Sequence, residues 1–214
     1  MDGVLVDSYQ THLKSWGAAA KLHGLSMTDD QFAKTFGRTS RDIIEALWPG
    51  RFIDAAALEF DKEKEAAYRE LLKAHFPEMD GAGDLIGALH AAGFALAIGS
   101  SGPAENVAVV KSSVPNGQFI SATVNGLEVK RGKPEPEVFL TAAKKLGIEP
   151  KYCAVIEDAI VGVDAARRAG MTSIGLLGTA PREALAVHAH LVVASLRELN
   201  PKLIAERIEQ RMQG

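Results

Sequence analysis

The sequence predicts an α/β protein, in which a parallel sheet forms the core and a helical domain is inserted near the N-terminus. Over residues 9–79 apolar side chains recur at spacings of three and four, the period of a helix. After residue 79 short apolar runs alternate with amphipathic segments, which is typical of parallel strands covered by helices on both faces. We therefore expect a core made of residues 1–8 and 80–214, with the helical domain over 9–79.

Local signals place helices inside the inserted segment. Gly24 is suited to end the first helix, and residues 28–31 have the capping-box form that starts the next one. Residues 54–75 carry charged side chains around an apolar seam and predict a long amphipathic helix. We interpret the charge run at 61–65 as a solvated face of that helix.

Four apolar runs predict the strands of the core, which are residues 94–98, 154–156, 173–177 and 190–193. Helices are expected at 137–146, at 161–169 ahead of Gly170, and at the C-terminus. This alternation predicts a Rossmann-like sheet, whose ligand site lies beyond the carboxyl ends of the strands. The Asn125-Gly126 pair predicts a small hairpin over 123–129.

Composition narrows the classes of function. The 214 residues suit one sizeable domain or a core with an insertion. The net charge is −3, and the acidic and basic residues are interspersed along the chain. These features give no electrostatic case for nucleic acid, and the longest apolar runs are too short to span a membrane. Cys153 is the only cysteine, so no intramolecular disulfide can form. We expect a monomer in the reducing cytoplasm.

Four motifs lie where predicted strands end, namely Met1-Asp2-Gly3-Val4-Leu5-Val6-Asp7-Ser8, Ser100, Lys133-Pro134 and Glu157-Asp158. In this order, with a helical insertion after the first, they resemble the haloacid dehalogenase superfamily, in its phosphatase and β-phosphoglucomutase-like branch. The resemblance covers nearly the whole chain. It implies a Mg²⁺-dependent phosphatase that acts on small phosphorylated metabolites, above all sugar phosphates, through an aspartyl-phosphate.

The resemblance gives Asp2 a role in acid–base catalysis. Residues two apart on a strand point the same way, so an Asp-x-Asp motif places two carboxylates in one pocket. The family uses the first as nucleophile and the second, here Asp2, as general acid and then base. The first would stand one residue before Met1, so we expect the chain as given to be inactive. We favour a truncated enzyme over an evolved pseudoenzyme, because losing a central strand removes much buried apolar area.

The remaining motifs supply charge and hydrogen bonds for a phosphate. Ser100, with Ser101 beside it, precedes a helix whose free N–H groups suit a phosphate. The resemblance implies that Lys133 neutralises the transferring phosphoryl group. It also implies a Mg²⁺ site made by Glu157, Asp158 and the backbone carbonyl of Asp2, which offers hard oxygen ligands.

The inserted domain resembles the family's cap, which selects the substrate. His12 matches a histidine of the mutase-like branch, and an ordinary half-buried role is as well supported as substrate contact. Residues 37–40 resemble the cap's substrate loop, in which Arg38 would bind a phosphate or a sugar. Arg41 is the alternate candidate, and a surface ion pair is open for either arginine.

Other functions stay open. β-Phosphoglucomutase uses the same site with a bisphosphate intermediate, and Arg38 and His12 permit that activity without requiring it. Phosphonoacetaldehyde hydrolysis would need a cap lysine, for which the position of Lys14 gives little support. Haloacid dehalogenation is disfavoured, because it does not need the acid–base and metal-binding carboxylates. A catalytically inactive protein that binds phosphorylated ligands is the alternative of another class.

Overall fold

The computed structural model describes residues 1–36 and 38–213, and the chain divides into two compact units. Unit 1 comprises Met1–Asp7 and Phe76–Gly214, and unit 2 comprises Ser8–His75. The sequence predicted the helical insertion over 9–79. That unit 2 acts as a substrate-selecting cap stays a prediction.

Unit 2 is helical, with α1 (Tyr9–Leu22), α2 (Asp29–Thr35), α3 (Ser40–Leu47) and α4 (Ala55–Ala74). The predicted capping box is present, because the Thr28 hydroxyl accepts a hydrogen bond from the Gln31 N–H while the Gln31 side chain accepts one from the Thr28 N–H. These bonds satisfy backbone donors that a helix N-terminus otherwise leaves free. An aromatic core holds the helices together, with Trp16, Phe32 and Phe60 at most 2% exposed.

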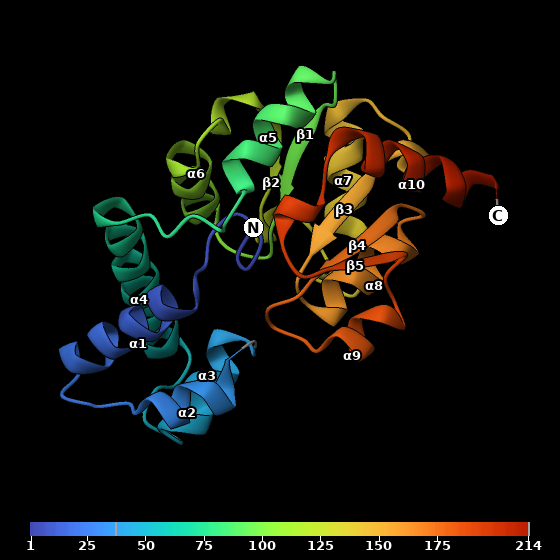
Figure 1. Ribbon diagram of the computed structural model, residues 1–214. Helices are drawn as coiled ribbons and strands as arrows, with labels where there is room; N and C mark the ends of the chain where they lie inside the picture. Colours follow the sequence, from blue (N-terminus) through green and yellow to red (C-terminus); the bar gives the residue numbers. More distant parts are fainter. Residues whose placement is uncertain (37, 214) are drawn as a thin grey trace. The chain divides into compact units, whose positions relative to one another are not determined.

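In the described residues of unit 1 the strands form two parallel sheets. One pairs β1 (Leu96–Gly99) with β2 (Ile120–Val124), and the other has the order β3 (Ala154–Glu157), β4 (Thr172–Leu176), β5 (Leu191–Val193). Helices separate the strands along the chain (Figure 1). The predicted α/β class with parallel strands is confirmed.

The α-helices of unit 1 are α5 (Ala82–Ala91), α6 (Ala104–Ser113), α7 (Glu137–Leu146), α8 (Ile160–Arg168), α9 (Arg182–Ala186) and α10 (Pro201–Gln213). Short 3₁₀ turns lie at Gly117–Phe119, Gly126–Glu128, Pro150–Tyr152 and Leu196–Glu198. Within the described residues, no helix is both long enough and apolar enough to traverse a lipid bilayer.

The predicted hairpin over 123–129 is wrong. Its first residues instead belong to β2, which pairs in parallel with β1, and Gly126–Glu128 forms a 3₁₀ turn. The Asn125 side chain accepts a hydrogen bond from the Leu127 N–H, so Asn125 caps that turn. A hairpin pattern was visible in the sequence, but long-range pairing with β1 determines the conformation.

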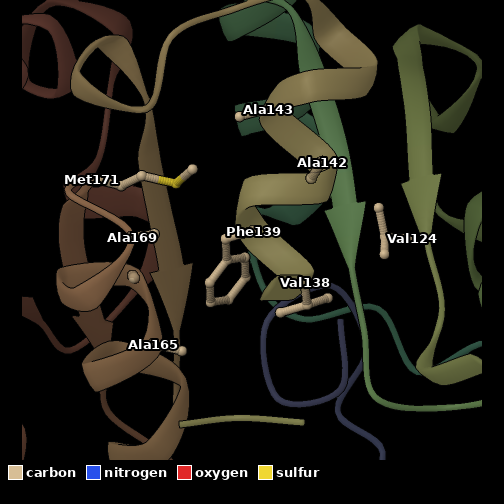
Figure 2. Packing of buried hydrophobic residues seen from close by; sticks show 9 residues of the cluster. Val124, Val138, Phe139, Ala142, Ala143, Ala165, Ala169 and Met171 are labelled. Atoms are coloured by element: carbon tan, nitrogen blue, oxygen red, sulfur yellow. The ribbon is translucent and has the colours of Figure 1, made fainter. Parts of the chain in front are cut away.

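One apolar cluster connects the two sheets. Val138 and Phe139 stand at the start of α7, and Figure 2 shows Val124 of β2 on one side of them and Ala165 and Met171 on the other. All five residues are at most 5% exposed. Helix α7 therefore packs between β2 on one side and α8 with the turn before β4 on the other, which connects the two sheets within one unit.

Candidate functional site

Three of the predicted site residues lie at the carboxyl ends of strands. Ser100 directly follows β1, Glu157 ends β3 and Asp158 follows it. They are only 4%, 5% and 8% exposed, respectively. Buried polar groups are costly without partners, so the bonds that each one makes are informative.

Lys133 and Glu157 form an ion pair, in which the Lys133 Nζ donates to Glu157 Oε1. Both side chains are largely buried, at 13% and 7% exposure. The ammonium also lies 5.1 Å from the centre of the Phe139 ring. Helix α8 approaches Glu157 so closely that a Cβ at Gly162 would collide with its carboxylate. The loop before α7 and the start of α8 thus hold this pair in place.

Asp158 is held by a residue that sequence reasoning missed. The Thr179 hydroxyl donates a hydrogen bond to Asp158 Oδ2. Burial raises the pKa of the Asp158 carboxyl above its ordinary value, the Thr179 bond opposes this rise, and the negative charge of Glu157 adds to it. The available signal was position, because Thr179 follows β4 at the sheet edge where the other site residues gather.

The turn that carries Asp2 lies against Asp158. Asp2 pairs with Val6 in an isolated bridge, and Gly3 between them has a φ of +68°. A Cβ at Gly3 would collide with the Asp158 carboxylate. Glycine is therefore required twice, once for the left-handed backbone and once for the close approach.

Ser100 lies where a loop leads toward α6. Its hydroxyl accepts a hydrogen bond from the Gly102 N–H at 3.0 Å, and its own N–H donates to the Val124 carbonyl at 2.9 Å. Ser101 is exposed. A Cβ at Gly126 would collide with the Ser101 carbonyl, so the turn after β2 packs on this loop. Because the N–H groups of Ser100 and Gly102 are both engaged, the Ser100 hydroxyl is the group with which this loop can donate a hydrogen bond to an anion.

The structure places His12 in a buried cluster of unit 2. Its ring stacks on Tyr68 with 4.3 Å between ring centres, and its Nδ1 lies 3.2 Å from the Lys64 Nζ. Lys64 is 3% exposed and pairs with Glu65 at 2.6 Å. The interpretation of 61–65 as a solvated face is therefore wrong at Lys64. Its ammonium is retained inside by Glu65, His12 and the aromatic rings of Tyr68 and Trp16.

The predicted arginines of unit 2 are exposed. Arg38 donates its backbone N–H to the Thr35 carbonyl at 3.2 Å, and Arg41 stands in the first turn of α3. Gly37, which belongs to the predicted substrate loop, lies outside the described residues. A substrate-binding role for Arg38 or Arg41 stays a prediction.

The donor set around Asp158 suits a hard divalent cation. Within the described residues no group of three or more His, Cys, Asp or Glu side chains gathers as a metal cluster. Glu157 and Asp158 nevertheless supply adjacent carboxylates, and Mg²⁺ binds through one or two carboxylates while it keeps several waters. Burial works against the charge on Asp158, and a bound cation would offset that cost.

Comparison with known proteins gives consistent matches. Residues 1–170 match the model of a family described as haloacid dehalogenase-like hydrolase. A validoxylamine A 7'-phosphate phosphatase from Streptomyces hygroscopicus subsp. limoneus is 30% identical over 93% of this chain and 92% of its own. A β-phosphoglucomutase from Bacillus subtilis (strain 168) is 27% identical over 98% of this chain and 93% of its own. A crystal structure of a HAD hydrolase, family IA, variant 3, from Entamoeba histolytica HM-1:IMSS has a TM-score of 0.84 at 28% identity. The match covers 98% of this chain and 96% of that chain.

Proposed function

Because this chain belongs to the haloacid dehalogenase-like hydrolases, we propose that its site, with a nucleophilic aspartate directly before Met1, hydrolyses small phosphorylated metabolites, most of all sugar phosphates. The observation that carries the proposal is the buried Lys133–Glu157 pair beside Asp158 at the end of β3. The Lys133 ammonium, fixed next to carboxylates where the parallel strands end, is suited to hold a phosphoryl group. The similarity to a validoxylamine A 7'-phosphate phosphatase supports a small phosphorylated substrate.

In the proposed mechanism the residues of unit 1 bind the phosphate and move protons. The Ser100 hydroxyl donates a hydrogen bond to the phosphoryl oxygens, and Lys133 offsets their charge. The carboxylate of an aspartate directly before Met1 accepts the phosphoryl group as an aspartyl-phosphate while Asp2 protonates the leaving oxygen. Asp2 then removes a proton from the water that attacks the aspartyl-phosphate and releases inorganic phosphate. Glu157 orients Lys133, and Asp158 with Glu157 and the Asp2 carbonyl would hold Mg²⁺. That ion would supply Lewis-acid stabilisation of the transferring group.

The part of the substrate beyond the phosphate is assigned to unit 2. We propose that His12 and Arg38 contact it, with Arg41 as the alternate to Arg38. A mutase is the second candidate function, because a β-phosphoglucomutase matches nearly the whole chain. The mutase reaction needs recognition of a second phosphate, which an arginine such as Arg38 can provide.

The test measures phosphate release from a panel of sugar phosphates with and without Mg²⁺. One version of the protein carries an upstream strand that ends in Asp directly before Met1, and its matched control ends in Asn. We expect Mg²⁺-dependent release from the first version and none from the control, with Lys133→Met reducing the rate at least about a hundredfold. Equal release from both versions would place the nucleophile elsewhere, and no release from either would refute the phosphatase.

Product analysis separates the two candidate activities. β-Glucose 1-phosphate is supplied together with a bisphosphate primer, and the products are identified by NMR. Free glucose and inorganic phosphate support the phosphatase, whereas glucose 6-phosphate in excess over phosphate supports the mutase.

A further inference from the structure

The loop that carries Lys133 is tied to the first residue of helix α7. The Glu137 carboxylate accepts a hydrogen bond from the Lys130 N–H at 2.9 Å through Oε1, and one from the Arg131 N–H at 3.1 Å through Oε2. Each oxygen thus binds one backbone donor, so two consecutive peptide groups are held in one orientation. Hydrogen bonds to a carboxylate are stronger than those between neutral groups. Glu137 therefore anchors a segment, residues 129–136, that forms neither helix nor strand.

The charge state of Glu137 suits this anchor. The hydrogen bond from the Lys130 N–H is the largest cause that lowers the pKa of the Glu137 carboxyl below its ordinary value. The Arg131 N–H and the positive charges of both side chains lower this pKa further, whereas burial opposes them. The carboxylate, which can accept a hydrogen bond at each oxygen, is thus the favoured form.

Beyond this anchor the loop turns sharply at Lys133. The Glu135 N–H donates to the Gly132 carbonyl at 3.0 Å, so Lys133 is a central residue of a tight turn. Its ammonium pairs with Glu157 and lies 5.1 Å from the centre of the Phe139 ring. That ring belongs to the first turn of α7, as the anchoring carboxylate does. One turn of helix therefore contacts both the backbone ahead of Lys133 and the end of its side chain.

The ion pairs of the same loop are weaker. Glu135 lies 3.4 Å from the Arg131 guanidinium and 3.5 Å from that of Arg168 in α8. The two arginine side chains are 71% and 49% exposed, and exposed ion pairs contribute little to stability. Among these contacts, the two backbone hydrogen bonds of Glu137 hold the loop most strongly.

We propose that Glu137 is a positioning residue, which fixes the loop so that the Lys133 ammonium reaches Glu157 and, during the reaction, the phosphoryl group. The contact with the phosphoryl group rests on the proposed function, whereas the placement of Lys133 against Glu157 does not. Glu137 acts through the backbone of Lys130 and Arg131. Without it the loop would open locally more often, and the Lys133 ammonium would spend more time in solvent.

The test measures how fast Lys133 is acetylated in the 214-residue chain and in its variants. N-Hydroxysuccinimidyl acetate is the reagent, and mass spectrometry of peptides gives the rate at each lysine. Acetylation needs access to the Lys133 Nζ, whose side chain is 13% exposed. The variants are Glu137→Ala and Glu137→Gln, and Glu198→Ala is the matched control. Glu198 accepts the N–H groups of Ala194 and Ser195 at 2.8 and 3.0 Å, so the control loses the same kind of contact on the loop after β5.

We expect Glu137→Ala to accelerate the acetylation of Lys133 at least about tenfold, because the loop opens more often. Glu137→Gln should have a smaller effect, since its amide offers one acceptor oxygen in place of two. Glu198→Ala should leave the rate at Lys133 unchanged. An unchanged rate in Glu137→Ala, or an equal acceleration in Glu198→Ala, would overturn the proposal. If the alanine variant does not fold, the glutamine variant decides in the same way.

Kinetics tests the link to catalysis in the version that carries an aspartate directly before Met1. Glu137→Ala should lower kcat at least about tenfold, since a small misplacement of a catalytic group is costly. In a Lys133→Met background the same substitution should change kcat less than about twofold, because Glu137 acts through Lys133. Equal effects in both backgrounds would refute the positioning role. If no version releases phosphate, the proposed function fails, and the acetylation rates still decide whether Glu137 places Lys133.

Discussion

Replacing Lys133 by methionine tests whether Lys133 and Glu157 form a buried ion pair in which each charge compensates the other. The two side chains are 13% and 7% exposed, so the substitution leaves the Glu157 carboxylate inside the protein without its cation. Breaking a buried pair from one side costs about 3–5 kcal/mol. At about 2–4 °C per kcal/mol for a chain of this size, the midpoint of thermal unfolding should fall by about 6–20 °C.

Two further variants make this prediction specific. Lys133→Met combined with Glu157→Gln removes both charges, and we expect it to recover most of the lost stability, because an uncompensated carboxylate no longer remains. Lys202→Met removes a pair with Glu206 in which the lysine is 86% exposed and the atoms are 3.9 Å apart; its midpoint should not change measurably. Calorimetry measures all three. An unchanged midpoint for Lys133→Met, or losses that simply add in the double variant, would refute the reasoning.

Three other predictions concern backbone contact, titration and the cluster in unit 2. Gly162→Ala should lower the free energy of unfolding by about 1–3 kcal/mol, because its Cβ would collide with Glu157. At Gly17 a Cβ meets no atom within 4 Å, so Gly17→Ala should instead raise the free energy of unfolding in urea by up to about 1 kcal/mol. Burial raises the folded-state pKa of Asp158 above its unfolded value of 3.8. The free energy of unfolding therefore falls as the pH rises from 3.8 through the folded-state pKa. Asp158→Asn should lack this decline in metal-free buffer. Lys64→Met should lower the free energy of unfolding by about 3–5 kcal/mol, since Glu65 loses its buried cation. Chemical denaturation that shows no such loss would contradict a buried Lys64–Glu65 ion pair.

The sequence predicted the elements and the family more completely than the contacts. Strand–helix alternation after residue 79 was sufficient for the α/β class, because continuous apolar runs and glycine-terminated helices are local signals. Family membership and the enzyme class of a haloacid dehalogenase-like phosphoryl-transfer hydrolase are confirmed. The predicted hairpin failed because the Asn125-Gly126 pair carries a local preference, whereas β2 is determined by pairing with β1, more than twenty residues away in sequence.

The site was predictable in part, for a related reason. Ser100, Glu157 and Asp158 follow apolar runs, and strand ends in parallel sheets meet at one edge, so their positions could be inferred from order alone. Thr179 was missed because threonine carries no distinctive motif and contacts Asp158 across 21 residues. Lys64 was missed because its charged neighbours are partly or fully exposed, and nothing in the local pattern shows that one lysine of the run turns inward.

The charges around Asp158 indicate why the site suits a cation and a phosphate together. The Lys133 ammonium is already compensated by Glu157, so it does not also neutralise Asp158, whose pKa is raised chiefly by burial. A divalent cation bound by the two carboxylates would compensate the charge of Asp158 and leave the group of Lys133, Glu157, Asp158 and the cation with a net positive charge. Because electrostatic attraction is strong where water is excluded, a phosphate would then bind at the carboxyl ends of β1 and β3. In this arrangement Glu157 contributes to the binding of both the phosphate and the cation, since it orients Lys133 and lies next to the Asp158 carboxylate, which favours the cation.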